Sequence, residues 1–129
     1  MINYNSIPDW EKEVLRITNN AGVDHVVEVV GSDNINKSIE AVKTGGTISL
    51  IGVINGFNGT INTAQIMGKQ IRLQGIEVGS KSMFIRMNNA IALHKMHPVI
   101  HNVYGFNEAK EALTVLENGK HFGKIVLSM

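Results

Sequence analysis

Apolar residues recur along the chain at two spacings, one helical and one extended. Trp10, Val14 and Ile17 follow Pro8 at helical intervals, and proline suits the first turn of a helix because its missing N–H would be unpaired there. The run at residues 25–30 is instead apolar and β-branched on successive positions, which is typical of a strand in a parallel sheet covered on both faces. The pattern therefore predicts a first helix from Pro8 and then a buried strand.

The remaining elements follow from the same spacing and from turn residues. A second helix, capped by Ser32 or Asp33, carries apolar residues as far as Val42 and ends at Gly45-Gly46. Further strands are expected at residues 47–53, 70–78, 99–104 and 124–129, and further helices at 63–67, 80–97 and 108–118. Strands that alternate with helices in this way predict an α/β fold with a parallel sheet and right-handed crossovers.

The two longest later helices have recognisable ends. Ser80 or Ser82 can cap the first of them, and Asn107 can cap the second. Gly119 stands where a left-handed C-terminal cap belongs. The apolar faces of both helices are expected to point inward, with Met83, Met87 and Ile91 in the first and Ala109, Ala112, Leu113 and Leu116 in the second.

Composition narrows the classes of protein that the chain can belong to. Hydrophobic residues make up 43% and charged residues 18% of 129 residues, which is a globular balance. A net charge of +1 with no block of like charge argues against nucleic-acid and membrane partners. Because there is no cysteine, disulfides and thiolate metal sites within the chain are excluded. With no apolar run long enough to span a bilayer and no recognisable secretory signal, a cytoplasmic location is the default expectation.

Four segments carry a resemblance to a known superfamily. They are GVDHVVEVVG at residues 22–31, TGGTISLIGV at 44–53, LQGIEVGS at 73–80 and GKHFGKIVL at 119–127. In this order and spacing they resemble the later half of the cofactor domain of zinc-type alcohol dehydrogenases and quinone reductases, in the medium-chain dehydrogenase/reductase superfamily. The resemblance implies a partial Rossmann fold, a doubly wound parallel sheet without its first βαβ part. Residues 1–97 would be the C-terminal half of the dinucleotide-binding domain, and residues 98–129 a closing segment that returns to the catalytic domain.

The chain does not contain the motif that binds the pyrophosphate in this superfamily. No Gly-x-Gly-x-x-Gly occurs in it, and residues 2–4 match the family's third strand, so the chain is expected to be a truncated piece. The parent enzyme would transfer hydride between an alcohol or carbonyl compound and NAD or NADP. The chain alone is expected to be inactive and to hold no bound cofactor. The substrate, the choice between NAD and NADP, and the use of zinc would be decided outside it.

Two other interpretations stay open beside that one. The chain could act only as a structural or oligomerisation module, which is compatible with a parent oxidoreductase. A Rossmann-like methyltransferase is a weaker alternative, because the glycine-rich loop that such an enzyme needs is also missing.

The resemblance assigns eight residues to the cofactor crevice, and none to catalysis or metal binding. They are Val30, Gly31 and Ser32 on the adenosine side, Ile51, Gly52 and Val53 near the nicotinamide ribose and carboxamide, and Ile76 and Val78, whose backbone would offer a carbonyl and an N–H to the carboxamide. The alternative is that Gly31 and Gly52 only end strands, and that Ile76 and Val78 are core residues. Lys124 could supply a point charge to the pyrophosphate or be a solvated lysine.

Several other side chains could in principle carry chemistry. His94, His97 and His101 are close in sequence, but without a nearby cysteine or carboxylate they are expected to be solvated rather than metal ligands. Glu28 lies in a buried strand and could be a general base, but a hydrogen-bonded structural role is favoured because it stands at the strand end near polar backbone. Ser49 and Ser80 lack the His and Asp spacing of a nucleophile.

The resemblance also implies a homodimer or larger assembly. Family members associate through the strand that runs here from Gln70 to Val78, with Arg72 and Gln74 expected to face outward. The strand at residues 26–30 would form a second open edge, apolar and without a guarding lysine or proline, which favours further association.

Overall fold

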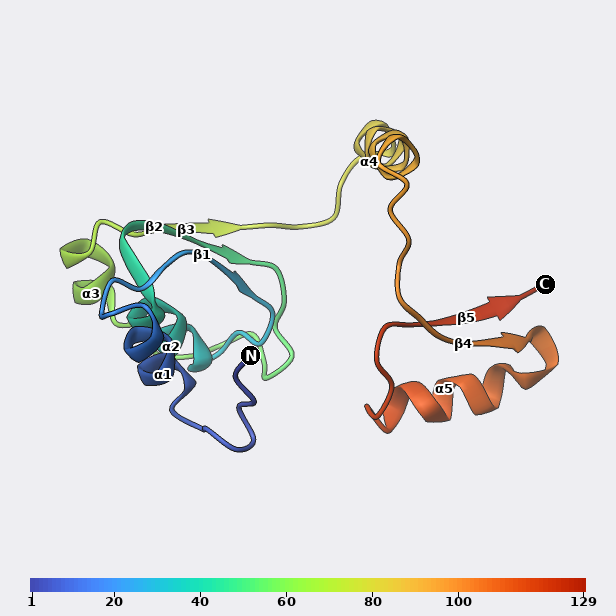
Figure 1. Ribbon diagram of the computed structural model, residues 1–129, viewed down its shortest axis with the longest axis horizontal. Coiled ribbons are helices and arrows are strands. Elements are labelled where there is room, and N and C mark those ends of the chain that lie inside the picture. Colours follow the sequence, from blue (N-terminus) through green and yellow to red (C-terminus); the bar gives the residue numbers. More distant parts are fainter. The chain divides into compact units, whose positions relative to one another are not determined.

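The computed structural model describes residues 1–129, and it confirms an α/β fold with parallel strands (Figure 1). The chain forms two compact units, Met1–Val78 and Gly79–Met129, each with its own sheet. The predicted boundary at residues 97 and 98 concerns the domains of a parent enzyme, and it stays a prediction. No helix is both long enough and apolar enough to cross a membrane.

The first unit is a three-stranded parallel sheet with helices against one face. Its strands lie in the order β1-β2-β3. In the register of the sheet, Val27 of β1 pairs with Ser49 of β2, and Ser49 pairs with Gln74 of β3. The bounds are α1 Trp10–Ile17, β1 Val23–Glu28, α2 Asn34–Ala41, β2 Val42–Leu50, α3 Thr63–Gly68 and β3 Arg72–Gly75. Figure 1 shows α1 and α2 on the same side of the sheet. The sheet therefore has the parallel strand order of the predicted partial Rossmann fold, with β1 and β3 at its edges, and helices on one face of it.

The core of this unit lies between α2 and the sheet. Its members are Ile35, Ile39, Val42, Ile48 and Ile71, each at most 9% exposed. Successive side chains of a strand point to opposite faces, so Val26 packs on this core while Val27 is 62% exposed. The prediction that both faces of the sheet are covered is thus wrong within the unit, because helices lie on one face only.

The boundary between α2 and β2 differs from the prediction. Val42 has extended backbone angles and starts β2, so Gly45 and Gly46 lie inside a strand instead of ending a helix. The C-terminal end of α2 is instead capped by the Lys69 ammonium, which donates to the carbonyl oxygens of Ile39, Glu40 and Val42 at 2.7–2.9 Å. Cations favour the C-terminal end of a helix, where carbonyl groups are unpaired. Partial burial lowers the pKa of Lys69.

Other elements in the first unit are shorter than predicted. Strand β1 ends at Glu28, because the carbonyls of Val29 and Val30 accept hydrogen bonds from the loop after β2. Strand β3 covers only Arg72–Gly75 of the predicted residues 70–78. Residues 2–4 form no strand, and Pro8 precedes α1 by two residues instead of lying in its first turn.

The second unit contains two helices, a single 3-10 turn and a two-stranded parallel sheet. The bounds are α4 Lys81–Leu93, β4 Ile100–Gly105, η1 Phe106–Glu108, α5 Ala109–Glu117 and β5 Lys124–Ser128. Two predicted caps are confirmed: the Ser80 hydroxyl accepts from the Met83 N–H at 3.3 Å, and Gly119 is left-handed with φ 61°. The Asn107 cap is wrong, because residues 106–108 form the 3-10 turn and α5 starts after Glu108.

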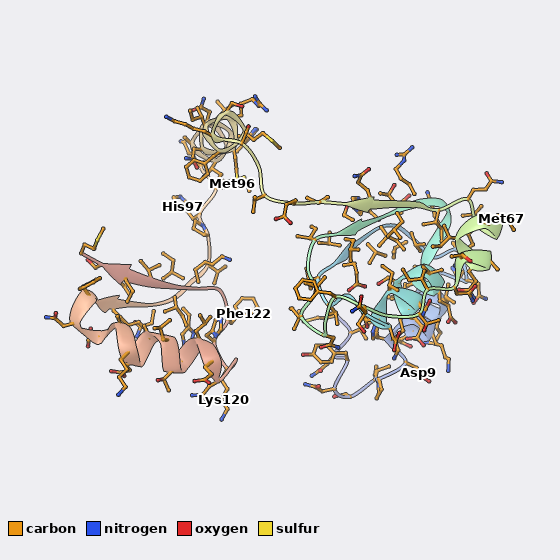
Figure 2. All side chains as sticks on the ribbon, turned by 180° about the vertical axis from the view of Figure 1, so that it is seen from behind. Asp9, Met67, Met96, His97, Lys120 and Phe122 are labelled. Carbon is orange, nitrogen blue, oxygen red and sulfur yellow. The ribbon has the colours of Figure 1, made fainter.

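The apolar faces of the second unit are largely open. Met83 and Met87 are 52% and 49% exposed, so the predicted core role of this stripe is wrong within the unit. Figure 2 shows the side chains of α4 projecting on all sides, and none of them is buried. Of the predicted inward positions of α5 only Ala112 is buried, while Leu113 and Leu116 are more than half exposed. Two strands offer too little surface to cover a helix face.

Candidate cofactor crevice

The turns that follow β1 and β2 lie against each other. Parallel strands end at the same edge of a sheet, so the segments after them are neighbours. The N–H of Asn55 donates to the carbonyl of Val30 at 2.9 Å, and a Cβ on Gly52 would overlap the carbonyl of Val29. The structure therefore brings together the predicted residues at positions 30–32 and 51–53, at the carboxyl edge of the sheet.

Glycine is required at the end of β1 for two reasons. Gly31 has φ +71°, and a Cβ there would lie 3.0 Å from Cα of Val53 and 3.1 Å from the carbonyl oxygen of Gly52. Both the left-handed backbone and the close approach disfavour a larger residue at this position. The packing of the two turns is therefore enough to explain this glycine, and a contact of Gly31 with a cofactor stays a prediction.

The Glu28 carboxylate organises the turn between β1 and α2. It is 2% exposed, and it accepts hydrogen bonds from the backbone N–H groups of Val30 at 2.8 Å and Gly31 at 3.0 Å. The Asn34 amide donates to both carboxylate oxygens at 2.9 and 3.1 Å, and the Ser38 hydroxyl donates to one of them. Buried charges are tolerated when they are hydrogen-bonded in this way. The favoured structural role of Glu28 is confirmed.

Sequence reasoning missed Asn34 and Ser38 as part of this arrangement. They are four residues apart on α2 and share the helix face that looks onto the sheet. A carboxylate in a buried strand needs donors, and two polar residues on the inward face of the next helix could have indicated them.

A cavity of about 200 Å³ opens beside the predicted adenosine side. Its lining includes Gly31, Ser32, Val53, Phe57, Asn58 and Gly59. The Ser32 hydroxyl donates to the Asn58 carbonyl at 2.8 Å, and the Asp33 carboxylate accepts from the N–H of Thr60 at 2.9 Å. The loop after β2 is thereby held to the start of α2, and it supplies lining residues that the sequence did not single out.

Ile76 and Val78 follow β3 and do not belong to the core. They are 44% and 88% exposed, so the alternative that they are core residues is wrong. The N–H of Ile76 donates to the carbonyl of Leu50 at 2.9 Å, which places Ile76 next to the end of β2. The carbonyl of Ile76 accepts no hydrogen bond, which leaves it free for a ligand.

The chain by itself does not form a metal site. No three His, Asp or Glu side chains lie close enough together to hold an ion, and there is no cysteine. His94, His97 and His101 are exposed, and the ring of His101 meets the ring of His121 edge-on, with 6.2 Å between centroids. The zinc of the resembling dehydrogenases therefore has no ligand set among these residues.

One polar pair crosses the open face of the sheet. Nε2 of His25 lies 2.7 Å from Oγ of Ser49, a contact that sequence spacing did not indicate. No carboxylate is hydrogen-bonded to His25, so the pair lacks the third group that would orient the imidazole for nucleophilic catalysis.

In the second unit the side chain of Lys124 is exposed and has no ion-pair partner.

Comparisons with known proteins agree with this geometry. The family described as zinc-binding dehydrogenase matches residues 1–127. A zinc-type alcohol dehydrogenase-like protein of Schizosaccharomyces pombe is 36% identical over 99% of this chain and 38% of its own length. An NAD-dependent alcohol dehydrogenase of Saccharolobus solfataricus is 29% identical over 95% of this chain and 35% of its own length.

Solved structures give the same picture. A putative alcohol dehydrogenase from Sinorhizobium meliloti superposes with a TM-score of 0.84 at 35% identity, over 94% of this chain and 35% of its own. An NAD-dependent alcohol dehydrogenase gives a TM-score of 0.80 at 32% identity, over 95% of this chain and 36% of its own. The chain thus spans little more than a third of the proteins that it matches. On its sequence and its fold, the chain belongs to the zinc-binding dehydrogenase family.

Proposed function

We propose that the chain forms one wall of the dinucleotide crevice of an NAD(P)-dependent alcohol dehydrogenase-like oxidoreductase, which transfers hydride between an alcohol or carbonyl compound and nicotinamide. The observation that carries the proposal is the meeting of two glycine turns, after β1 and after β2, at the carboxyl edge of a parallel sheet. In doubly wound folds, ligands bind outside this edge. The family membership supplies the reaction class, and a cytoplasmic location remains part of the proposal.

The residues at this edge suit a flat, amide-bearing ligand. Eight of them would line the wall: Val30, Gly31, Ser32, Ile51, Gly52, Val53, Ile76 and Val78. A carboxamide is recognised by backbone donors and acceptors. The free carbonyl of Ile76 would provide the acceptor, and the N–H of Val78 would provide the donor once it leaves the Glu77 carboxylate, to which it donates at 3.0 Å. Ile51 and Val53 are 49% and 39% exposed and offer apolar surface beside them. When bound, the nicotinamide would accept or donate the hydride.

An exchange of segments tests the proposal directly. The part of the Schizosaccharomyces pombe relative that matches this chain would be replaced by residues 1–129, and dinucleotide-dependent alcohol or aldehyde turnover would be measured. We expect activity, with Ser32→Asp raising the KM for the dinucleotide because it adds a negative charge on the adenosine side. The matched control is Ser6→Asp on an exposed turn. A folded, inactive chimera would contradict the proposal, as would equal effects of the two substitutions.

The chain alone is expected to be inactive and to bind NAD(H) or NADP(H) weakly or not at all. Tight binding of the pyrophosphate needs donors at a helix N-terminus, and hydride transfer needs substrate and cofactor held in contact. Isothermal titration and turnover assays of the pure chain should give no saturable signal. A tight stoichiometric isotherm would show that one wall is sufficient.

The alternative role is a structural or oligomerisation module, and a specific edge supports it. β3 is an outer strand of its sheet, with Arg72 and Gln74 exposed, so its backbone can pair with a second copy across residues 70–78. Light scattering should report at least a dimer. Leu73→Pro should reduce the assembly by removing a ladder donor. Because Leu73 also packs on the core, Arg72→Glu serves as a second variant. A clean monomer of the unmodified chain would contradict this role.

A further inference from the structure

Asparagine precedes glycine at three places in the chain, residues 55–56, 58–59 and 118–119. In such pairs the glycine nitrogen can attack the asparagine side-chain amide, because no Cβ on the following residue hinders the approach. We propose that Asn58 is a modification site, at which the folded chain converts asparagine to aspartate and isoaspartate through a cyclic imide. The structure singles out this pair from the other two.

The chemistry needs only the chain and water. The backbone nitrogen of Gly59 bonds to Cγ of Asn58, the bond from Cγ to Nδ2 breaks, and ammonia leaves with a proton from the glycine nitrogen. Water then opens the imide at either carbonyl, which gives aspartate or isoaspartate. The glycine N–H must lose its proton during attack, so the rate should increase with pH.

The three pairs differ in whether the attacking nitrogen is free. The N–H of Gly56 donates to the carbonyl of Val53 at 2.9 Å, and the N–H of Gly119 donates to the carbonyl of Leu116 at 3.1 Å. Attack at either place requires that hydrogen bond to break first. The N–H of Gly59 donates no hydrogen bond, and the exposed side chain of Asn58 has none either. Among the three pairs, only Asn58-Gly59 has an attacking N–H that need not first break a hydrogen bond, although the backbone on either side of it is held at the Asn58 carbonyl and the Thr60 N–H.

The conversion would change the cavity that Asn58 lines. Aspartate adds a carboxylate near Gly31 and Ser32, and isoaspartate also inserts a methylene into the main chain. The Asn58 carbonyl, which accepts from the Ser32 hydroxyl, would then be displaced. If the proposed function holds, both products weaken dinucleotide binding, but the conversion itself does not depend on that function.

The test compares the three pairs inside one protein. The folded chain would be incubated in mildly alkaline buffer, digested, and followed by peptide mass spectrometry, with isoaspartate detected by enzymatic methylation. The same incubation in denaturant removes the structural differences between the pairs. The control variant Asn58→Gln keeps an amide, but would need a larger ring to form the imide.

We expect Asn58 to be converted first in the folded chain, while Asn55 and Asn118 are strongly slowed relative to the denatured chain. Asn58→Gln should abolish isoaspartate at this position and leave the other two unchanged. Equal or faster conversion of Asn55 or Asn118 in the folded chain would overturn the proposal. So would an absence of isoaspartate at Asn58 when the denatured chain forms it.

Discussion

The two compact units have similar elements but very different interiors. In the first, α2 lies on three parallel strands, and a continuous group of isoleucine and valine side chains is sealed between them. In the second, α5 and two strands bury only Tyr104 and Ala112. The sheets have the same parallel pairing and the helices are of similar length, so the difference comes from the number of strands that each helix can cover.

This difference shows what a third strand adds. Two strands present a surface narrower than the apolar face of a helix, so Leu113 and Leu116 stay more than half exposed. With three strands, Ile39 is sealed completely. The first unit can therefore be stabilised by its own core, whereas the second depends on surfaces that it does not itself provide.

The largest expected effect comes from Glu28→Ala in the first unit. It leaves the N–H groups of Val30 and Gly31 and the side chains of Asn34 and Ser38 without their acceptor. The expected loss in the free energy of unfolding is about 3–5 kcal/mol. The single tryptophan, Trp10, reports unfolding of this unit by fluorescence.

The matched control for this variant is Glu77→Ala. Its carboxylate accepts only from the N–H of the next residue at an exposed position. The change should cost under about 0.5 kcal/mol. If both variants lose the same free energy of unfolding, the buried hydrogen bonds of Glu28 do not stabilise the fold more than an exposed one does.

A paired truncation compares the two interiors directly. Ile39→Ala removes a side chain that is 0% exposed and should cost about 2–4 kcal/mol in the stability of the first unit. Leu116→Ala removes a side chain that is 51% exposed, and it should cost under about 1 kcal/mol in the second. Hydrogen exchange resolved by peptide reports each unit separately. Equal losses would mean that Leu116 is buried in solution.

A smaller effect is expected for Lys69→Met, which leaves three carbonyls at the end of α2 without their cation. The expected cost is about 1–2 kcal/mol, since the ammonium also complements the helix dipole. Lys110→Met on α5 is the control, because that ammonium has no hydrogen-bonded partner. The measurement is urea unfolding followed by Trp10 fluorescence, together with hydrogen exchange for the control.

Much of the fold could be predicted from the chain, because its local signals agree with one another. The β-branched runs and the glycines between them predicted the parallel strands β1 and β2, and serine and glycine caps located the ends of α4 and α5. The end of α2 could not be predicted in this way. It is fixed by Lys69, which lies far along the chain and contributes through space rather than through a local sequence signal.

The candidate crevice was predictable in position but only partly in its members. The glycines at positions 31 and 52 lie in the turns after β1 and β2 as expected, but the strands end earlier than predicted, at Glu28 and Leu50. The contribution of Phe57 and Asn58 depends on a loop that is held by side-chain hydrogen bonds to the start of α2, and no spacing in the sequence encodes those contacts. The burial of the methionine stripe was overestimated, because helical spacing identifies an apolar face without showing what covers it.

The carboxylate of Glu28 acts as an internal anion at the start of α2. It occupies the two backbone donors of the turn, and the N–H groups of the first helical turn already donate to the carbonyls of Gly31, Ser32 and Asp33. A phosphate approaching this helix would find these donors already occupied, with a carboxylate behind them. The start of α2 therefore keeps only the N–H groups of Ser32 and Asp33 without a hydrogen bond, so it offers an anion fewer donors than a helix start that holds no buried carboxylate.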